Sequence, residues 1–250
     1  YQPLALFKIY SIAIFFGCLL LFTHFYSLAL NMAKKRKKKK LHLIVFVILM
    51  LSLTAGLIWF SNRPRFVHYK DFCIDMKSGG TPSRTDNSFW NNNDIPWIKT
   101  GEIKNNILIQ AEEYISERAL KNSSAKILPK DTVLMSMYGV NAGDIGILKF
   151  EATTNQACCG MICENSMQAA FLYYHLLHNQ KFIATQAIGG AQENLSKDFI
   201  EKIKIPIPDD DKLNSLILKT IVDNKENYTR QNQKLTELKT VLLSKLATMD

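Results

Sequence analysis

The first 61 residues contain no aspartate or glutamate, although they hold eight of the 31 lysines and arginines of the chain. Residues 62–208 are nearly balanced, with 16 basic and 15 acidic residues, and residues 209–250 have seven of each. The net charge of +9 and the pI near 9.2 therefore describe the N-terminal quarter and not the remainder. The pI is therefore no evidence that the remainder of the chain binds a polyanion such as DNA.

Cysteine is scarce, and its spacing fits neither a disulfide framework nor a zinc site. The five cysteines are odd in number, include one adjacent pair and form no CxxC pair. Since a secreted, disulfide-stabilised domain normally has an even and spaced set, the globular part is predicted to be reduced and cytosolic. We interpret Cys158, Cys159 and Cys163 as part of a buried strand rather than as metal ligands.

The N-terminal quarter contains two long uncharged stretches. As a helix, residues 41–60 would be about 30 Å long, which matches the hydrocarbon core of a bilayer and predicts a transmembrane helix. Residues 9–30 form a second, weaker candidate. The basic run at residues 34–40 is then a cytoplasmic collar against anionic headgroups, with a nucleic-acid patch as the alternative. Met32 is an alternative start, which would make the preceding residues translated upstream sequence.

From Phe66 onward, short apolar runs alternate with turn signals. The runs IPWIKT, DTVLMSMYG, IGILKF and ACCGMIC carry the residues that strands favour and predict strands. A helix is predicted from Met167 to about Ile188, begun by Asn165 or Ser166 and ended by two glycines. A short helix near Ser196 and an edge strand in KIKIPIP follow. The pattern predicts a mixed α/β domain over residues 66–208.

Residues 209–250 contain neither glycine nor proline and begin with three aspartates, so they predict one long helix. Its heptad seam is polar in the middle. Two interpretations stay open: pairing with one partner helix in a specified register, or packing on the helix's own domain. The predicted contacts with a partner helix are Ile217, Ile221, Tyr228, Leu235, Leu238 and Leu242.

One sparse pattern suggests catalysis. Asp94, Glu102 and Lys104 loosely match a magnesium-dependent nuclease, in which two carboxylates hold the metal and the lysine polarises water. Such a pattern often arises by chance. The segment GVNAGDIG has neither of the phosphate-loop orders and is interpreted as a tight connection between strands. The globular part is therefore predicted to be a binding module with no catalytic residue, cofactor or metal of its own.

Side chains that read base edges gather near the predicted turns. Asn and Gln can form two hydrogen bonds to adenine, and Arg or Lys can do the same to guanine. Each is individually more typical of a turn or a surface. The candidate DNA-binding residues are Ser78, Thr81, Ser83, Arg84, Lys99, Asn141, Asn155, Gln156, Gln192 and Asn194.

Five segments, taken in order, resemble the specificity subunit of type I restriction-modification systems. They are SGGTPSRTDNSFWNNNDIPWIKTGEIKNN, AEEYISERALKNSSAKILPKDTVLMSMYG, EATTNQACCGMI, GGAQENLSKDFIEKIKIPIP and LTELKTVLLSKLATMD. The resemblance covers about residues 66–250. It implies a target-recognition domain that docks on the major groove of double-stranded DNA, and a conserved spacer helix. It also implies a cytoplasmic, non-catalytic subunit, whose methyltransferase partner uses S-adenosylmethionine and whose restriction partner uses ATP and Mg.

Three features depart from that family. A single recognition domain implies either a half-subunit that forms a homodimer or pairs with a second recognition domain, or the end of a longer gene. The helix starts with DDDKLNSL in place of a Pro-rich, Glu-Gln start. The hydrophobic residues 1–61 suggest membrane association, and a span over 41–60 would carry the recognition domain outside, away from DNA. The conflict indicates that the two parts did not evolve together. They would have been joined by a gene rearrangement or by a misassembled reading frame. A nuclease and a membrane-tethered interaction protein remain the alternatives.

Overall fold

The structure is a computed structural model that describes residues 27, 39–61, 64–91, 93–188, 195–207, 213 and 217–247. The chain divides into two units, Tyr1–Arg63 and Pro64–Asp250, and each is described by itself. Most of the predicted basic collar at residues 34–40, and nearly all of the uncharged stretch at residues 9–30, lie outside the described residues.

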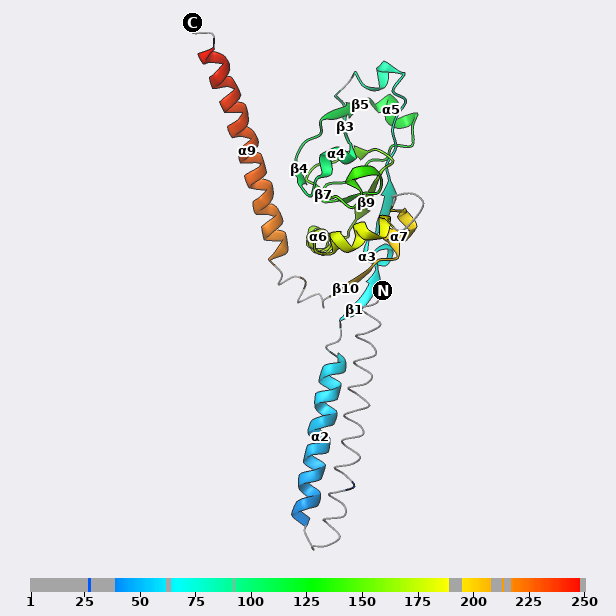
Figure 1. Ribbon diagram of the computed structural model, residues 1–250, viewed down its shortest axis with the longest axis vertical. Helices are drawn as coiled ribbons and strands as arrows, with labels where there is room; N and C mark the ends of the chain where they lie inside the picture. Colours follow the sequence, from blue (N-terminus) through cyan, green and yellow to red (C-terminus); the bar gives the residue numbers. More distant parts are fainter. Residues whose placement is uncertain are drawn as a thin grey trace. The chain divides into compact units, whose positions relative to one another are not determined.

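In the first unit, the described residues form helix α2, Lys39–Ser61 (Figure 1). Its sequence has one glycine, Gly56, and no proline, so nothing interrupts the backbone hydrogen bonds. Large apolar side chains such as Phe46 and Leu51 are exposed along it. Within the described part of the chain, no helix is long and apolar enough to cross a membrane. The helix predicted over 41–60 is therefore confirmed as a helix, while its prediction as a membrane span is not supported.

The second unit is a mixed α/β domain, as the sequence predicts (Figure 1). Its strands form a five-stranded, a three-stranded and a two-stranded sheet. Its elements in order are β1 Arg65–His68, α3 Tyr69–Phe72, β2 Asp75–Ser78, η1 Asn87–Phe89, β3 Ile95–Ile98, α4 Thr100–Ile103, β4 Ile107–Leu108, β5 Glu113–Ile115, α5 Glu117–Lys121, β6 Val133–Ser136, η2 Gly139–Asn141, β7 Ile145–Leu148, β8 Thr153–Thr154, β9 Cys158–Ile162, α6 Ser166–Ile188, α7 Lys197–Glu201, β10 Lys204–Ile207 and α9 Leu218–Leu246.

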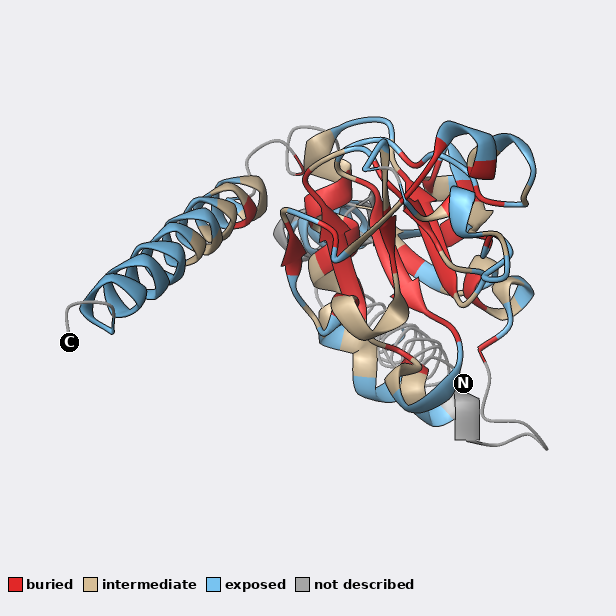
Figure 2. Cartoon of the chain, turned by 90° about the horizontal axis from the view of Figure 1, so that it is seen from above, coloured by how far each residue is buried: buried red, intermediate tan, exposed pale blue. Residues whose placement is uncertain are grey.

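The five-stranded sheet, in the order β2-β9-β6-β7-β4, forms the centre of the domain. Every residue of β6, β7 and β9 is buried, which Figure 2 shows as a block of red strands. Strands covered on both faces have continuous apolar sequences, because neither face needs polar residues. The three strands predicted in this region are confirmed, and Cys158 and Cys159 lie buried in β9 with free thiols. The GVNAGDIG segment is the predicted tight connection between β6 and β7.

Helix α6 packs against the central sheet. It begins where predicted, because Asn165 Oδ1 accepts the backbone N–H groups of Met167 and Gln168, both at 3.0 Å. Leu172 and Leu176 are fully buried in the core that α6 shares with β6, β7 and β9. The two glycines predicted to end the helix lie outside the described residues.

The two-stranded sheet pairs β1 with β10 in antiparallel register, with Phe66 opposite Pro206. Pro206 has no N–H to donate, so the predicted edge position of this strand is confirmed for the described residues. The short helix predicted near Ser196 is α7, whose N-terminus the Ser196 hydroxyl caps by accepting the Phe199 N–H at 3.1 Å.

In the three-stranded sheet, β3 lies between β5 and β8. Trp97 and Ile115 are buried in a small separate core beside it. Strands β3 and β8 are parallel, with Trp97 opposite Thr153. Their carboxyl ends therefore lie at the same edge of the sheet, which brings together Lys99 and Asn155, the residues that follow these ends.

Helix α9 packs on its own domain mainly through its first half, against α6 and β4, and Gln233, just beyond the middle, donates to Gln110 Oε1 at 2.6 Å. Val222 is its buried residue at 2% exposure, and all residues from 234 to 247 are exposed. Figure 2 shows this as a mostly pale blue helix that is tan and red at its inner end. The six predicted partner-helix contacts are between 40% and 68% exposed. Their contact with a partner helix stays a prediction. Most of residues 209–216, which were also predicted to be helical, lie outside the described residues.

Candidate nucleic-acid interface

The loop at residues 79–84 lies against the three-stranded sheet and is held there by two indole N–H groups. Trp97 Nε1 donates to the Gly80 carbonyl at 3.0 Å, and Trp90 Nε1 donates to the Ser83 carbonyl at 2.9 Å. A Cβ atom on Gly80 would lie 2.5 Å from the Ala125 nitrogen, so this close approach requires glycine. The loop is therefore fixed in position by the sheet beneath it.

Arg84, at the end of this loop, is immobilised while half of its side chain stays exposed. Its guanidinium carbon lies 3.5 Å from the centroid of the Trp90 ring and 4.9 Å from that of Trp97. Its Nη1 atom is 2.6 Å from Glu113 Oε2, and the side chain is 50% exposed. Stacking and the ion pair restrict the rotamers of a long side chain. Because a guanidinium has five N–H donors, one carboxylate leaves others available to a ligand.

Glu113 joins Arg84 to a second candidate, Lys99. Lys99 Nζ lies 2.8 Å from Glu113 Oε1 and 3.1 Å from Glu112 Oε2. The hydrogen bonds that Lys99 donates, first to Glu113 and then to Glu112, raise the pKa of Lys99. Partial burial favours a higher pKa for Glu113, but the hydrogen bonds from Lys99 and Arg84 outweigh it and lower that pKa. The two cations thus share one carboxylate.

Two further candidates meet beside this loop: Thr81, which belongs to it, and Gln156, which lies in the connection between β8 and β9. The exposed Thr81 hydroxyl donates to Gln156 Oε1, and Gln156 is itself exposed. Asn155 lies beside them, but its backbone N–H donates to the Ile98 carbonyl at 3.1 Å, and its side chain accepts from the Cys158 thiol. Asn155 therefore stabilises the connection between β8 and β9, while Thr81 and Gln156 present polar groups to solvent.

The other candidates are more scattered. Ser83 is exposed on the Arg84 loop, where its hydroxyl contacts Thr85 Oγ1 at 2.8 Å. Ser78 ends β2 and is half-buried opposite Cys159. Asn141 belongs to a different segment, η2, between β6 and β7. Gln192 and Asn194 lie outside the described residues.

Glu113 is a member of the site that sequence reasoning missed. Its position follows from the pairing of β3 with β5, which places it opposite Trp97 and beside Arg84. The only signal in the sequence is the acidic pair Glu112-Glu113 before a strand, and such pairs are common on surfaces.

The predicted nuclease residues do not form a metal site. Asp94 and Glu102 flank β3 on opposite sides, and its four residues are about 13 Å long. Both Glu102 oxygens accept backbone N–H groups, from Lys99 at 2.8 Å and from Glu112 at 2.9 Å. Across the described residues, no group of three or more His, Cys, Asp or Glu side chains is placed to hold a metal ion. Glu102 is a loop cap, and the nuclease alternative is not supported.

One protein family and several individual proteins are similar to this chain. The family described as "Type I restriction modification DNA specificity domain" matches residues 65–239. The type I restriction enzyme EcoR124I/EcoR124II specificity subunit of Escherichia coli is 24% identical over 160 residues, which cover 58% of this chain and 40% of that protein. The MjaIX specificity subunit of Methanocaldococcus jannaschii is 27% identical over 171 residues, which cover 66% and 39% of the two chains.

A solved structure has a similar fold. The crystal structure of the type I restriction-modification system S subunit from M. genitalium matches with a TM-score of 0.55 and 16% identity, over 92% of this chain and 59% of that one. At this identity the likeness concerns the fold alone. The chain spans about two fifths of the length of the two specificity subunits above: the matched segments cover 40% and 39% of those two proteins.

Proposed function

The chain belongs to the type I restriction modification DNA specificity domain family, and on this premise we propose that its second unit recognises one part of a DNA target sequence. The gathering of Arg84, Lys99 and Gln156 around the loop at residues 79–84 carries the proposal. Arg and Lys match the guanine edge and Gln matches the adenine edge in the major groove. A donor held in one rotamer loses little entropy when it meets its base, which favours discrimination.

Charge in this unit supports recognition of bases over general attraction to phosphates. Arg84 and Lys99 are each paired with a carboxylate of the same surface, and residues 62–208 carry a net charge near zero. Phosphate contacts supply most non-specific affinity, whereas base-edge contacts supply specificity. Such a domain discriminates sequences while partner subunits contribute much of the phosphate binding.

The proposed partners follow from the same premise. The second unit would act as a non-catalytic, cytoplasmic specificity module. A methyltransferase subunit would supply S-adenosylmethionine chemistry, and a restriction subunit would use ATP and Mg. A second recognition domain would pair through α9. The exposed Leu235, Leu238 and Leu242 on the free half of that helix support such pairing.

Selection from a randomised pool of duplex DNA tests the proposed function. The full chain is expected to enrich one short sequence and to bind it at least about tenfold more tightly than a scrambled duplex in a fluorescence anisotropy titration. Arg84→Ala should reduce this preference. Arg118→Ala, which removes an equal charge from exposed helix α5, is the matched control and should retain it. Equal binding to all sequences by the native chain contradicts the proposal.

A further inference from the structure

Helix α9 touches its domain through a short and largely polar face. Val222 is buried and Leu218 is half-buried, but the next residues toward the domain are Lys225, Glu226 and Thr229. Further along, a cleft of about 280 Å³ opens between α9 and the segment at residues 101–112. Close apolar packing, the usual means of fixing the crossing angle of a helix, is therefore limited at this contact.

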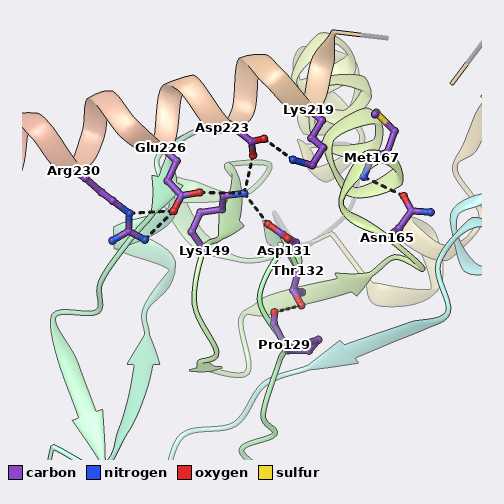
Figure 3. Close-up of polar contacts among 10 residues, drawn as sticks. All are labelled: Pro129, Asp131, Thr132, Lys149, Asn165, Met167, Lys219, Asp223, Glu226 and Arg230. Carbon is purple, nitrogen blue, oxygen red and sulfur yellow. Dashed lines mark hydrogen bonds and ion pairs between the residues drawn. The ribbon is translucent and has the colours of Figure 1, made fainter. Parts of the chain in front are cut away.

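A buried cation lies where α9 meets the sheet. Lys149 directly follows β7, and its side chain is 4% exposed. Its Nζ atom lies 2.8 Å from Asp131 Oδ1 in the domain. It also lies 3.3 Å from Glu226 Oε2 and 3.7 Å from Asp223 Oδ1, both on α9 (Figure 3). One ammonium group thus joins a carboxylate of the domain to two carboxylates on adjacent turns of the helix.

Asp223 and Glu226 each have two cationic partners: Lys149 of the domain and one basic residue of α9 itself. Asp223 pairs with Lys219 and Glu226 pairs with Arg230, each four residues away along α9 (Figure 3). The helix therefore needs no cation from the domain to be stable as a helix. The Lys149 contacts instead orient the helix relative to the domain, because Asp223 and Glu226, on successive turns of α9, both contact the buried Lys149 ammonium.

We infer that Lys149 is a positioning residue that sets the direction in which α9 leaves the recognition domain. The distance from Glu226 to Leu246 along the helix is about 30 Å. A rotation of about 10° at the anchor would move the far end by about 5 Å, which exceeds the rise of one base pair. The inference deepens the proposed function and rests on it in one respect: a second recognition domain held by α9 would have its distance along the DNA set by Lys149.

Distance measurements between spin labels test the positioning role directly. Labels at Lys126→Cys in the domain and Lys239→Cys on α9, in a full chain with Cys18 and Cys163 replaced by serine, report the direction of the helix. Both labelled residues are exposed. The native sequence and Lys149→Arg should give one narrow distance distribution, whereas Lys149→Met should give a broad one. Lys121→Met, in which an exposed lysine loses an ordinary helix pair, is the matched control and should stay narrow.

A second variant guards against misfolding of Lys149→Met. Asp223→Asn combined with Glu226→Gln removes the helix side of the cluster and leaves the pair between Lys149 and Asp131 intact. Its circular dichroism spectrum should match that of the native chain, while its distance distribution broadens as for Lys149→Met. A narrow, native distribution in this folded double variant overturns the inference.

Binding to paired half-sites separates this inference from the proposed function. Duplexes carry two copies of the selected sequence with spacers of different lengths. The double variant should bind a single copy within about twofold of the native chain, since the ion pairs of Lys149 are with Asp131, Asp223 and Glu226 and not with the loop at 79–84. Its preference among spacers should fall from about tenfold to less than about threefold. If the native chain selects no sequence, the proposed function fails, and the label distances still decide the role of Lys149.

Discussion

The second unit contains two ion clusters that differ both in their ratio of cations to carboxylates and in their exposure to solvent. In the Arg84 cluster, one carboxylate, Glu113, is shared by two cations that are 50% and 35% exposed. In the Lys149 cluster, one cation that is 4% exposed is shared by three carboxylates. An exposed pair exchanges its partner for a ligand at little cost, whereas a buried charge left unpaired is strongly destabilising. The first cluster is therefore suited to binding and the second to holding elements together.

The largest effect is expected from breaking the buried cluster. Lys149→Met keeps an unbranched apolar side chain but removes the ammonium group, which leaves Asp131 without its cation, so the free energy of unfolding should fall by about 3 kcal/mol. Urea denaturation followed by circular dichroism measures it. Lys121→Met, which breaks a pair whose side chains are 76% and 74% exposed, should change it by less than about 0.5 kcal/mol. Equal effects of the two substitutions would remove the contrast between the clusters.

Breaking the exposed cluster should affect binding more than folding. Arg84→Ala removes a held donor, so we expect a loss of about 2 kcal/mol in binding to the selected sequence. The free energy of unfolding should fall by no more than about 1 kcal/mol, because an exposed ion pair and a cation–π contact are each weak. Anisotropy titration and urea denaturation measure the two quantities. A loss confined to stability would mean that Arg84 is a structural residue.

Acid should weaken the exposed cluster through Glu113. The folded pKa of Glu113 lies below its ordinary value of 4.5, because Lys99 and Arg84 donate to the ionised carboxylate. Its stabilisation is therefore complete above the ordinary pKa and is lost as the pH falls through the lower folded pKa. Glu113→Gln should cost about 1 kcal/mol of unfolding free energy at pH 7. Urea denaturation from pH 7 to pH 3 should show this difference shrinking, and a difference independent of pH would contradict the assignment.

The smallest effect on folding is expected on the free half of α9. Leu238 is 59% exposed, so Leu238→Ala should change the free energy of unfolding of the dilute chain by less than about 0.5 kcal/mol. If α9 pairs with a second helix, the same substitution should weaken self-association, which sedimentation velocity at increasing concentration measures. Thr236→Ala, on the same exposed half of the helix, is the control. A large loss of stability at low concentration would show that Leu238 packs within its own chain.

Local patterns in the sequence were enough to locate the central buried strands and the two long helices of the second unit, although ten of its eighteen described elements were not predicted. The apolar runs predicted β6, β7 and β9, and Asn165 marked the start of α6. These signals are local, because burial on both faces or an N-cap is visible in the residues of one segment. The prediction of a membrane span over 41–60 gained no support, although the helix itself was correct.

The candidate site was predicted in part. Thr81, Arg84, Lys99 and Gln156 were chosen as residue types near turns, and the structure brings them to one loop and sheet edge. Asn155 was chosen on the same grounds but holds the loop together instead. The difference depends on which polar atoms meet a partner inside the protein, and residue type alone does not contain this information.

The amino-acid sequence alone is enough to establish the mixed α/β class, the near-neutral charge of residues 62–208, the long final helix and the family resemblance that residues 65–239 bear out. The folded chain adds that Glu113 serves both Arg84 and Lys99, and that Lys149 joins Asp131 to α9. Secondary structure follows from the periodicity of neighbouring residues. A shared charge depends on strand register and helix packing between residues far apart in the chain, so it exists only once the chain has folded.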